Sequence, residues 1–135
     1  MAIESPLILV VDDDIDFQEL TRHVLEKVGY RVLCCSDSDE ALRQCERSKP
    51  ALIITDLMMA SLDSGFSLSR RIRDDLGATD TPIILVTAVG SQKGFDFRPR
   101  TAEDLAAMRV DAYFDKPVAP KTLLAKVKEL LTLRE

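Results

Sequence analysis

Acidic, hydroxyl and basic side chains lie at or just beyond the ends of four apolar runs of this 135-residue chain. They are Asp12-Asp13, Asp56, Thr87 and Lys116. Two carboxylates about 5 Å apart repel each other by roughly 3 kcal/mol at an effective dielectric constant near 20. Three crowded carboxylates therefore require a cation or a raised pKa. Mg²⁺ meets that need because it takes hard oxygen ligands and keeps several waters.

The same residue types are suited to phosphoryl transfer. A carboxylate can act as the nucleophile and form an acyl phosphate. A bound Mg²⁺ can bridge to a phosphate oxygen and offset the charge that develops during transfer. The ammonium of Lys116 and the hydroxyl of Thr87 can supply further donors for the phosphoryl oxygens. This chemistry requires that the fold bring all of these side chains together.

Five short apolar runs alternate with amphipathic stretches along the chain. The runs are Leu7–Val11, Arg31–Cys35, Ala51–Thr55, Ile83–Val86 and Val110–Phe114. They lack a clean alternation of polar and apolar residues, as expected of strands that are buried on both faces. Strands that alternate with helices imply a parallel sheet covered by helices on both sides. The polar residues at the strand ends would then meet at one edge of the sheet.

The helical stretches are bounded by start and stop signals. Apolar residues recur at helical spacing over Phe17–Val28, and Gly29 then acts as a stop signal. Ser38 can cap a second helix, and Pro120 is well placed in the first turn of the last one. The other two helical stretches are the segment opened by Gly65, with Ile72 facing inward, and Thr101–Met108.

Length and composition favour one globular domain over residues 1–135. The net charge of −5 argues against direct DNA binding, which needs a basic face. The chain has no signal-peptide pattern and no apolar run near the roughly 20 residues of a membrane span. Its three cysteines, Cys34, Cys35 and Cys45, fit reduced apolar side chains, so we expect a cytoplasmic protein.

Four segments resemble motifs of a known family. They are Ile8–Asp14 (ILVVDDD), Ile54–Met59 (ITDLMM), Leu85–Ala88 (LVTA) and Asp115–Pro117 (DKP). In this order, each at an expected strand end, they resemble the receiver domains of two-component response regulators. The resemblance covers about residues 5 to 134 and implies a flavodoxin-like (βα)5 fold with strand order 2-1-3-4-5.

The resemblance assigns a role to each acidic residue. Asp56 would accept a phosphoryl group from a sensor histidine kinase or a phosphotransfer protein. Mg²⁺, with Mn²⁺ as an alternative, would be held by Asp13 directly and by Asp12 directly or through water. Asp56 and the backbone carbonyl of Met58 would complete the protein ligands.

The remaining roles concern signal output. Thr87 would be the switch hydroxyl and Tyr113 the aromatic switch residue, while Lys116 would contact the phosphoryl oxygens. The bond between Lys116 and Pro117 would be cis. Phosphorylation would shift the population toward a conformer with a changed partner-binding surface. The leading expectation is a regulator with no fused output domain, although a domain of a longer regulator fits the sequence as well. Its output would come from binding an unidentified output protein or from passing the phosphoryl group on in a phosphorelay, with a homodimer as one option.

Two segments depart from the family pattern. The loop after Asp56 carries Ala60 and Ser64 where a proline and a glycine are usual, and the glycine follows at Gly65. Lys116 follows Thr87 by 29 positions, which is longer than usual in the family. We therefore expect an extended segment at about 88–108, with a remodelled helix and a partner surface of its own.

Other functions fit less well. A hydrolase with an aspartate nucleophile commonly has a second aspartate two residues later, and that position is Met58. A phosphorylation-independent interaction domain would not need the complete acidic, threonine and lysine set. A flavin or nucleotide carrier would want a Gly-rich or Ser/Thr-rich loop after the first strand. The leading interpretation is a phosphoacceptor signalling domain with self-phosphorylation and self-dephosphorylation chemistry, rather than an enzyme.

Three further residues are expected to have modest roles. Asp14 would be a solvated neighbour of the acidic pair, and His23 an exposed residue beside the apolar helix face. Tyr113 could equally be a half-buried strand aromatic with no switching role.

Overall fold

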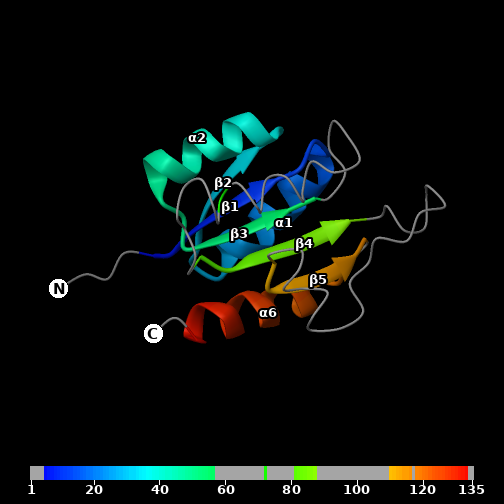
Figure 1. The fold of residues 1–135 in the computed structure, drawn as a ribbon. Coiled ribbons are helices and arrows are strands. Elements are labelled where there is room, and N and C mark those ends of the chain that lie inside the picture. The colour runs from blue at the N-terminus through cyan, green and yellow to red at the C-terminus, as the bar shows by residue number, and fades with distance from the viewer. Residues whose placement is uncertain (1–4, 57–71, 73–80, 88–109, 117, 134–135) are drawn as a thin grey trace.

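A five-stranded, all-parallel sheet forms the centre of the molecule (Figure 1). The structure is a computed structural model that describes residues 5–56, 72, 81–87, 110–116 and 118–133. The strands are β1 (Leu7–Val11), β2 (Arg31–Cys35), β3 (Leu52–Thr55), β4 (Ile83–Thr87) and β5 (Ala112–Asp115). Their spatial order is β2-β1-β3-β4-β5, which confirms the predicted fold class. Only the ends of β3, β4 and β5 differ from the expected bounds, by one or two residues.

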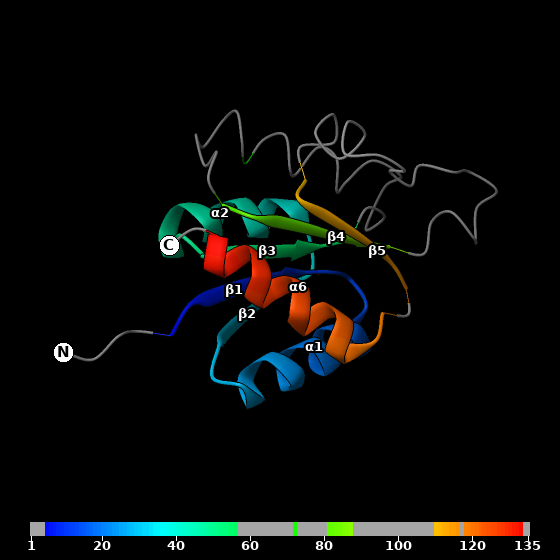
Figure 2. The same ribbon diagram turned by 90° about the horizontal axis from the view of Figure 1, so that it is seen from below.

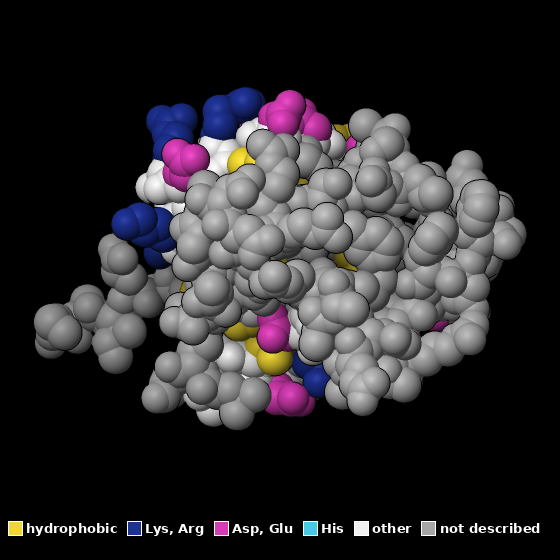
Figure 3. All heavy atoms as spheres, viewed as in Figure 1, with side chains coloured by type: hydrophobic (Ala, Val, Ile, Leu, Met, Phe, Trp, Pro, Cys, Tyr) yellow, Lys and Arg dark blue, Asp and Glu magenta, His cyan; other side chains and the backbone are white. Residues whose placement is uncertain are grey.

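Helices cover both faces of this sheet. The described helices are α1 (Ile15–Lys27), α2 (Ser38–Ser48) and α6 (Pro120–Leu133). Figures 1 and 2 show α1 and α6 side by side on one face and α2 on the other. The outer side of α2 carries charges of both signs, from Arg43 and Glu46 to Lys49 beyond its end, and is a solvated face (Figure 3).

The strands contribute alternate residues to two apolar clusters. Ile8 and Val10 pack on the side of α1 and α6, whereas Leu9 and Val11 pack on the side of α2. Every residue of β3 is buried. Burying one such aliphatic side chain contributes about 1.5–3 kcal/mol. The absence of polar alternation in the sequence therefore reflects a sheet with no solvent-facing side, as predicted.

The cysteines have the expected reduced form. Cys34 and Cys35 lie on opposite faces of β2, and all three thiols are free. Burial raises the pKa of Cys35 to about 12 and that of Cys45 to about 11. Both therefore stay protonated at neutral pH and act as small apolar core residues.

Asp14 is exposed, as expected, and the start of α1 gives it a further role. Its carboxylate accepts hydrogen bonds from the backbone N–H groups of Asp16 (3.0 Å) and Phe17 (3.3 Å), so Asp14 is the N-cap. It is more than a solvated neighbour, because it satisfies two backbone donors that a helix start leaves unpaired. The other end is as predicted: Gly29 follows the helix with φ of +103°, a conformation that glycine adopts readily.

The start of α2 corrects the expectation for Ser38. Asp37, and not Ser38, is the N-cap, and its Oδ1 accepts from the backbone N–H of Glu40 at 2.8 Å. Asp37 has extended backbone angles (φ −146°, ψ 166°), whereas Ser38 is the first helical residue. Both residue types are good caps, so the sequence alone could not decide between two adjacent candidates.

Replacing Asp37 tests this assignment. Asp37→Ala should lower the free energy of unfolding by about 1 kcal/mol, since the Glu40 N–H loses its acceptor. Ser38→Ala is the matched control and should have a much smaller effect. Urea denaturation followed by circular dichroism measures both variants. If Ser38→Ala lowers the free energy of unfolding more than Asp37→Ala does, Ser38 and not Asp37 is the N-cap.

The structure describes only part of the two remaining helical stretches. Ile72 is helical and fully buried in the cluster under α2, as its predicted inward position requires. The rest of the stretch opened by Gly65, the helix at 101–108 and the extended segment at 88–108 lie outside the described residues. Within the described ranges, no helix has the length and apolar character to cross a membrane.

Candidate functional site

The carboxyl ends of four strands bring the predicted site together at one edge of the sheet. Val11 pairs with Thr55 in register, so Asp12 and Asp56, the next residues, end neighbouring strands. The backbone N–H of Asp56 donates to the carbonyl of Val11 at 3.0 Å and holds the two ends together. On the far side, Thr87 pairs with Asp115, which places Lys116 just beyond the same edge.

Three carboxylates meet at this edge. One carboxylate oxygen each from Asp12, Asp13 and Asp56 lie within 4.8 Å of one another. Asp12 is fully buried and Asp56 is 6% exposed, whereas Asp13 is exposed and opens the cluster to solvent. Hard oxygen donors reached from water on one side are the donor set that Mg²⁺ takes. The chemistry of these residues therefore fits a divalent cation, as the sequence predicted.

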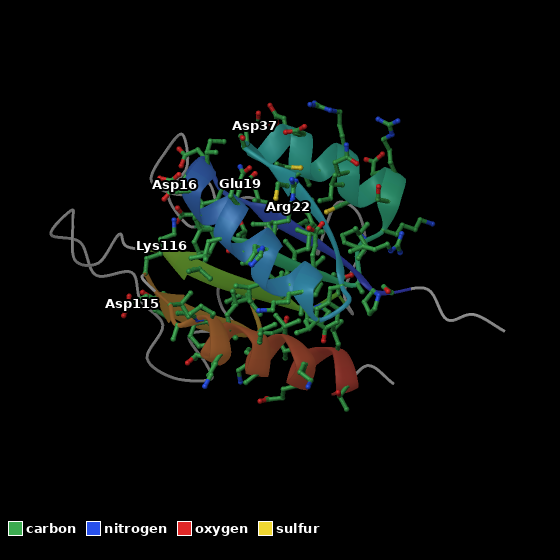
Figure 4. All side chains as sticks on the ribbon, turned by 180° about the vertical axis from the view of Figure 1, so that it is seen from behind. Asp16, Glu19, Arg22, Asp37, Asp115 and Lys116 are labelled. Atoms are coloured by element: carbon green, nitrogen blue, oxygen red, sulfur yellow. The ribbon has the colours of Figure 1, made fainter. Side chains whose placement is uncertain are left out.

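Lys116 connects two of the carboxylates. Its Nζ lies 2.7 Å from Asp12 Oδ2 and 3.2 Å from Asp56 Oδ2. The same ammonium lies 4.6 Å from the centroid of the Phe17 ring, a favourable cation–π distance. Figure 4 shows Lys116 at the end of β5, on the same side of the molecule as Asp16 in the first turn of α1. Lys116 thus joins the last strand to the acidic residues of the first and third.

The ammonium of Lys116 compensates the acidic cluster only in part. Burial raises the pKa of Asp12 to about 6, and the charge of Asp56 adds to this, although hydrogen bonds from Lys116 and the Asp14 N–H oppose it. Burial lowers the pKa of Lys116, but its hydrogen bonds to Asp12 and Asp56 and their charges outweigh this, so the pKa is raised. Two carboxylates share one ammonium. The charged form of Lys116 is therefore stabilised by both carboxylates, whereas the charged form of Asp12 is stabilised by this one cation and is disfavoured by burial.

The raised pKa of Asp12 predicts a pH-dependent stability in metal-free protein. The pKa of Asp12 is about 6 in the folded protein and 3.8 for an ordinary aspartate. Between pH 3.8 and pH 6, the folded protein therefore keeps a proton on Asp12 that the unfolded protein has lost. Relative to Asp12→Asn, which cannot titrate at this position, the parent should lose about 2 kcal/mol of unfolding free energy from pH 4 to 7. Urea titrations of both proteins across this range give the difference. A difference that stays constant or rises with pH would contradict the shift.

Gln18 is a site residue that the sequence interpretation missed. Its side chain is 6% exposed, and Nε2 donates to the backbone carbonyls of Asp12 and Cys35 (3.2 Å to the latter) and to Ser36 Oγ (3.2 Å). Phe17 was assigned only to an apolar helix face, although its ring also contacts Lys116. No periodicity indicates that a glutamine in the first turns of α1 is buried toward the strand ends, so only the three-dimensional structure reveals it.

The other predicted residues are placed in part. Tyr113 is half-buried, packs against the cluster under α2, and its hydroxyl is hydrogen-bonded to the carboxylate of Asp115. This contact fits a strand aromatic, and its switching role stays a prediction. His23 is exposed, as expected. The side chain of Thr87 and all of Met58 and Pro117 lie outside the described residues, so the carbonyl ligand and the cis bond are not tested.

Comparison with known proteins decides the family. Residues 8–128 match the model of the response regulator receiver domain. The chain belongs to this family. The crystal structure of a CheY-like response regulator receiver domain protein from Methanospirillum hungatei JF-1 has a TM-score of 0.79 to it at 28% identity. That similarity covers 95% of this chain and 94% of the other.

Curated relatives of this receiver domain are longer proteins. It is 36% identical over 136 residues to the probable transcriptional regulator ycf27 of Cyanophora paradoxa, covering 100% of this chain and 52% of the relative. It is also 36% identical over 128 residues to the alkaline phosphatase synthesis transcriptional regulatory protein PhoP of Bacillus subtilis, covering 95% and 49%. The chain thus spans about half the length of the curated relatives it matches.

Proposed function

We propose that this receiver domain accepts a phosphoryl group on Asp56 in a Mg²⁺-dependent reaction. The observation that carries the proposal is the ammonium of Lys116 between Asp12 and Asp56, beside the exposed Asp13. The donor would be a phosphohistidine on a sensor histidine kinase or a phosphotransfer protein, as membership of the family implies. The domain would act as a phosphoacceptor in signalling and not as an enzyme on an external substrate.

Asp12, Asp13 and Asp56 would hold the metal, with the backbone carbonyl of Met58 as a further ligand carried over from the family resemblance. Bound Mg²⁺ would offset the negative charge of the phosphoryl oxygens, and Mn²⁺ is an alternative with the same ligand preference. The carboxylate of Asp13 is exposed, so the ion could reach the site from solvent on that side, whereas Asp12 is buried at the inner side of the site.

In the transfer, a carboxylate oxygen of Asp56 attacks the phosphorus atom. A phosphorus–oxygen bond to Asp56 forms while the phosphorus–nitrogen bond to the donor imidazole breaks, and the imidazole leaves with the electron pair. Lys116 Nζ, already 3.2 Å from Asp56 Oδ2, can donate to the incoming phosphoryl oxygens. Its contact of 2.7 Å with Asp12 keeps the ammonium at the site before the donor arrives. The Thr87 hydroxyl would supply a further donor.

Output would follow from a change in a partner-binding surface. The names of the relatives describe transcriptional regulators, so we propose regulation of transcription through an output partner or an output domain. The acidic balance of the chain, with a net charge of −5, supports indirect rather than direct contact of this domain with DNA. A phosphorylation-dependent homodimer is one form that such an output could take.

Phosphorylation by a small donor tests the proposal. Incubation with acetyl phosphate and Mg²⁺ should add one phosphoryl group, located at Asp56 by mass spectrometry, and excess EDTA should prevent it. Asp56→Asn should carry no adduct. Asp16→Asn is the matched control, because Asp16 is an exposed aspartate in the first turn of α1, and it should be labelled like the parent. An unmodified parent, or an undiminished adduct in Asp56→Asn, would refute the proposal.

A further inference from the structure

We infer that Gln18 is a positioning residue, which sets the geometry of Asp12 for metal binding without touching the metal. The inference rests on the proposed function, since it concerns the same site. Its basis is the buried side-chain amide, which donates to the backbone carbonyl of Asp12 itself. A hydrogen bond to the backbone carbonyl of a metal-binding residue fixes the orientation of its peptide group. It thereby sets the direction in which the side chain of that residue points.

The amide of Gln18 ties together the ends of two adjacent strands. Asp12 follows β1 and Cys35 ends β2, and the backbone N–H of Asp12 donates to the carbonyl of Cys35 at 3.0 Å. Gln18 Nε2 reaches both carbonyls, as well as Ser36 Oγ. With two N–H groups for three acceptors, the amide is fully used. It therefore fixes the Asp12 peptide relative to β2 from the side of α1.

Gln18 is itself anchored by the residues that follow Asp12. Its backbone N–H donates to the carbonyl of Asp14 at 3.1 Å, and the N–H of Asp14 donates to Asp12 Oδ1 at 2.9 Å. Hydrogen bonds therefore link Asp12 to Asp14, Asp14 to Gln18, and the Gln18 amide back to the carbonyl of Asp12. We expect a change at Gln18 to affect Asp12 through these hydrogen bonds.

The neutrality of the Gln18 amide suits this role. An amide supplies two N–H donors with no net charge, whereas a lysine or arginine at the same place would compete with a cation for the Asp12 carboxylate. Lys116 already fills the cationic role at 2.7 Å. Gln18 thus orients Asp12 while leaving the charge of the acidic cluster available for the ion. Residues that orient metal ligands in this way affect metal affinity by about 10–100-fold when replaced.

Mg²⁺ affinity and stability, measured separately, test the inference. Gln18→Met keeps the length of the side chain but removes its donors, and Gln18→Asn keeps the amide but withdraws it by one methylene. Thr21→Val is the matched control, because Thr21 is 2% exposed, one turn further along α1. Isothermal titration calorimetry gives the Kd for MgCl₂ under conditions where urea titrations show that each variant is folded. The backbone carbonyl ¹³C shift of Asp12 in metal-free protein reports its hydrogen bond.

The Kd should rise by about 10–100-fold in Gln18→Met, with a shifted Asp12 carbonyl resonance, and should rise also in Gln18→Asn. Thr21→Val should leave the Kd unchanged. A folded Gln18 variant that binds Mg²⁺ with the same Kd as the parent, and differs from it only in stability, would overturn the inference. If Gln18→Met does not fold, Gln18→Asn provides the same comparison. The proposed metal site would still hold if the inference is overturned in this way, provided that the parent binds Mg²⁺ and that Asp13→Asn weakens this binding. No binding by the parent would overturn both.

Discussion

The carboxylate of Asp12 is removed from water by the fold and is only partly compensated by Lys116. This constraint shapes the surrounding structure, because a buried carboxylate needs donors and cations around it. The ammonium of Lys116 from beyond β5 and the N–H of Asp14 meet that need in part, while the charge of Asp56 increases it. The balance leaves an acidic site that a divalent cation would stabilise, and the proposed chemistry at Asp56 depends on that balance.

A parallel sheet is what allows residues so far apart in the chain to share one site. Asp12, Asp56 and Lys116 each follow the carboxyl end of a strand, and the register of β1 with β3 and of β4 with β5 aligns those ends. The apolar clusters on both faces keep the strands in place. The first turns of α1 then complete the site, with Phe17 beside Lys116 and Gln18 at the carbonyl of Asp12.

The sequence was sufficient for the strands and for the acidic residues, because strand burial and strand-end position both leave patterns in residue type. The strand expected at Ala51–Thr55 is present as Leu52–Thr55 and is buried, and Asp12 and Asp56 meet as expected. It was insufficient where neighbouring residues have similar propensities, as with Asp37 and Ser38. It also failed for Gln18, whose burial depends on how α1 packs against two strand ends and not on periodicity.

The most direct test of the account is a crystal structure grown with Mg²⁺ and beryllium fluoride, a mimic of the phosphoryl group. We expect one Mg²⁺ among the carboxylates of Asp12, Asp13 and Asp56, beryllium fluoride on Asp56, and Lys116 Nζ in contact with a fluoride. Density showing Lys116 still shared between Asp12 and Asp56, with no ion among the carboxylates and no adduct on Asp56, would contradict it.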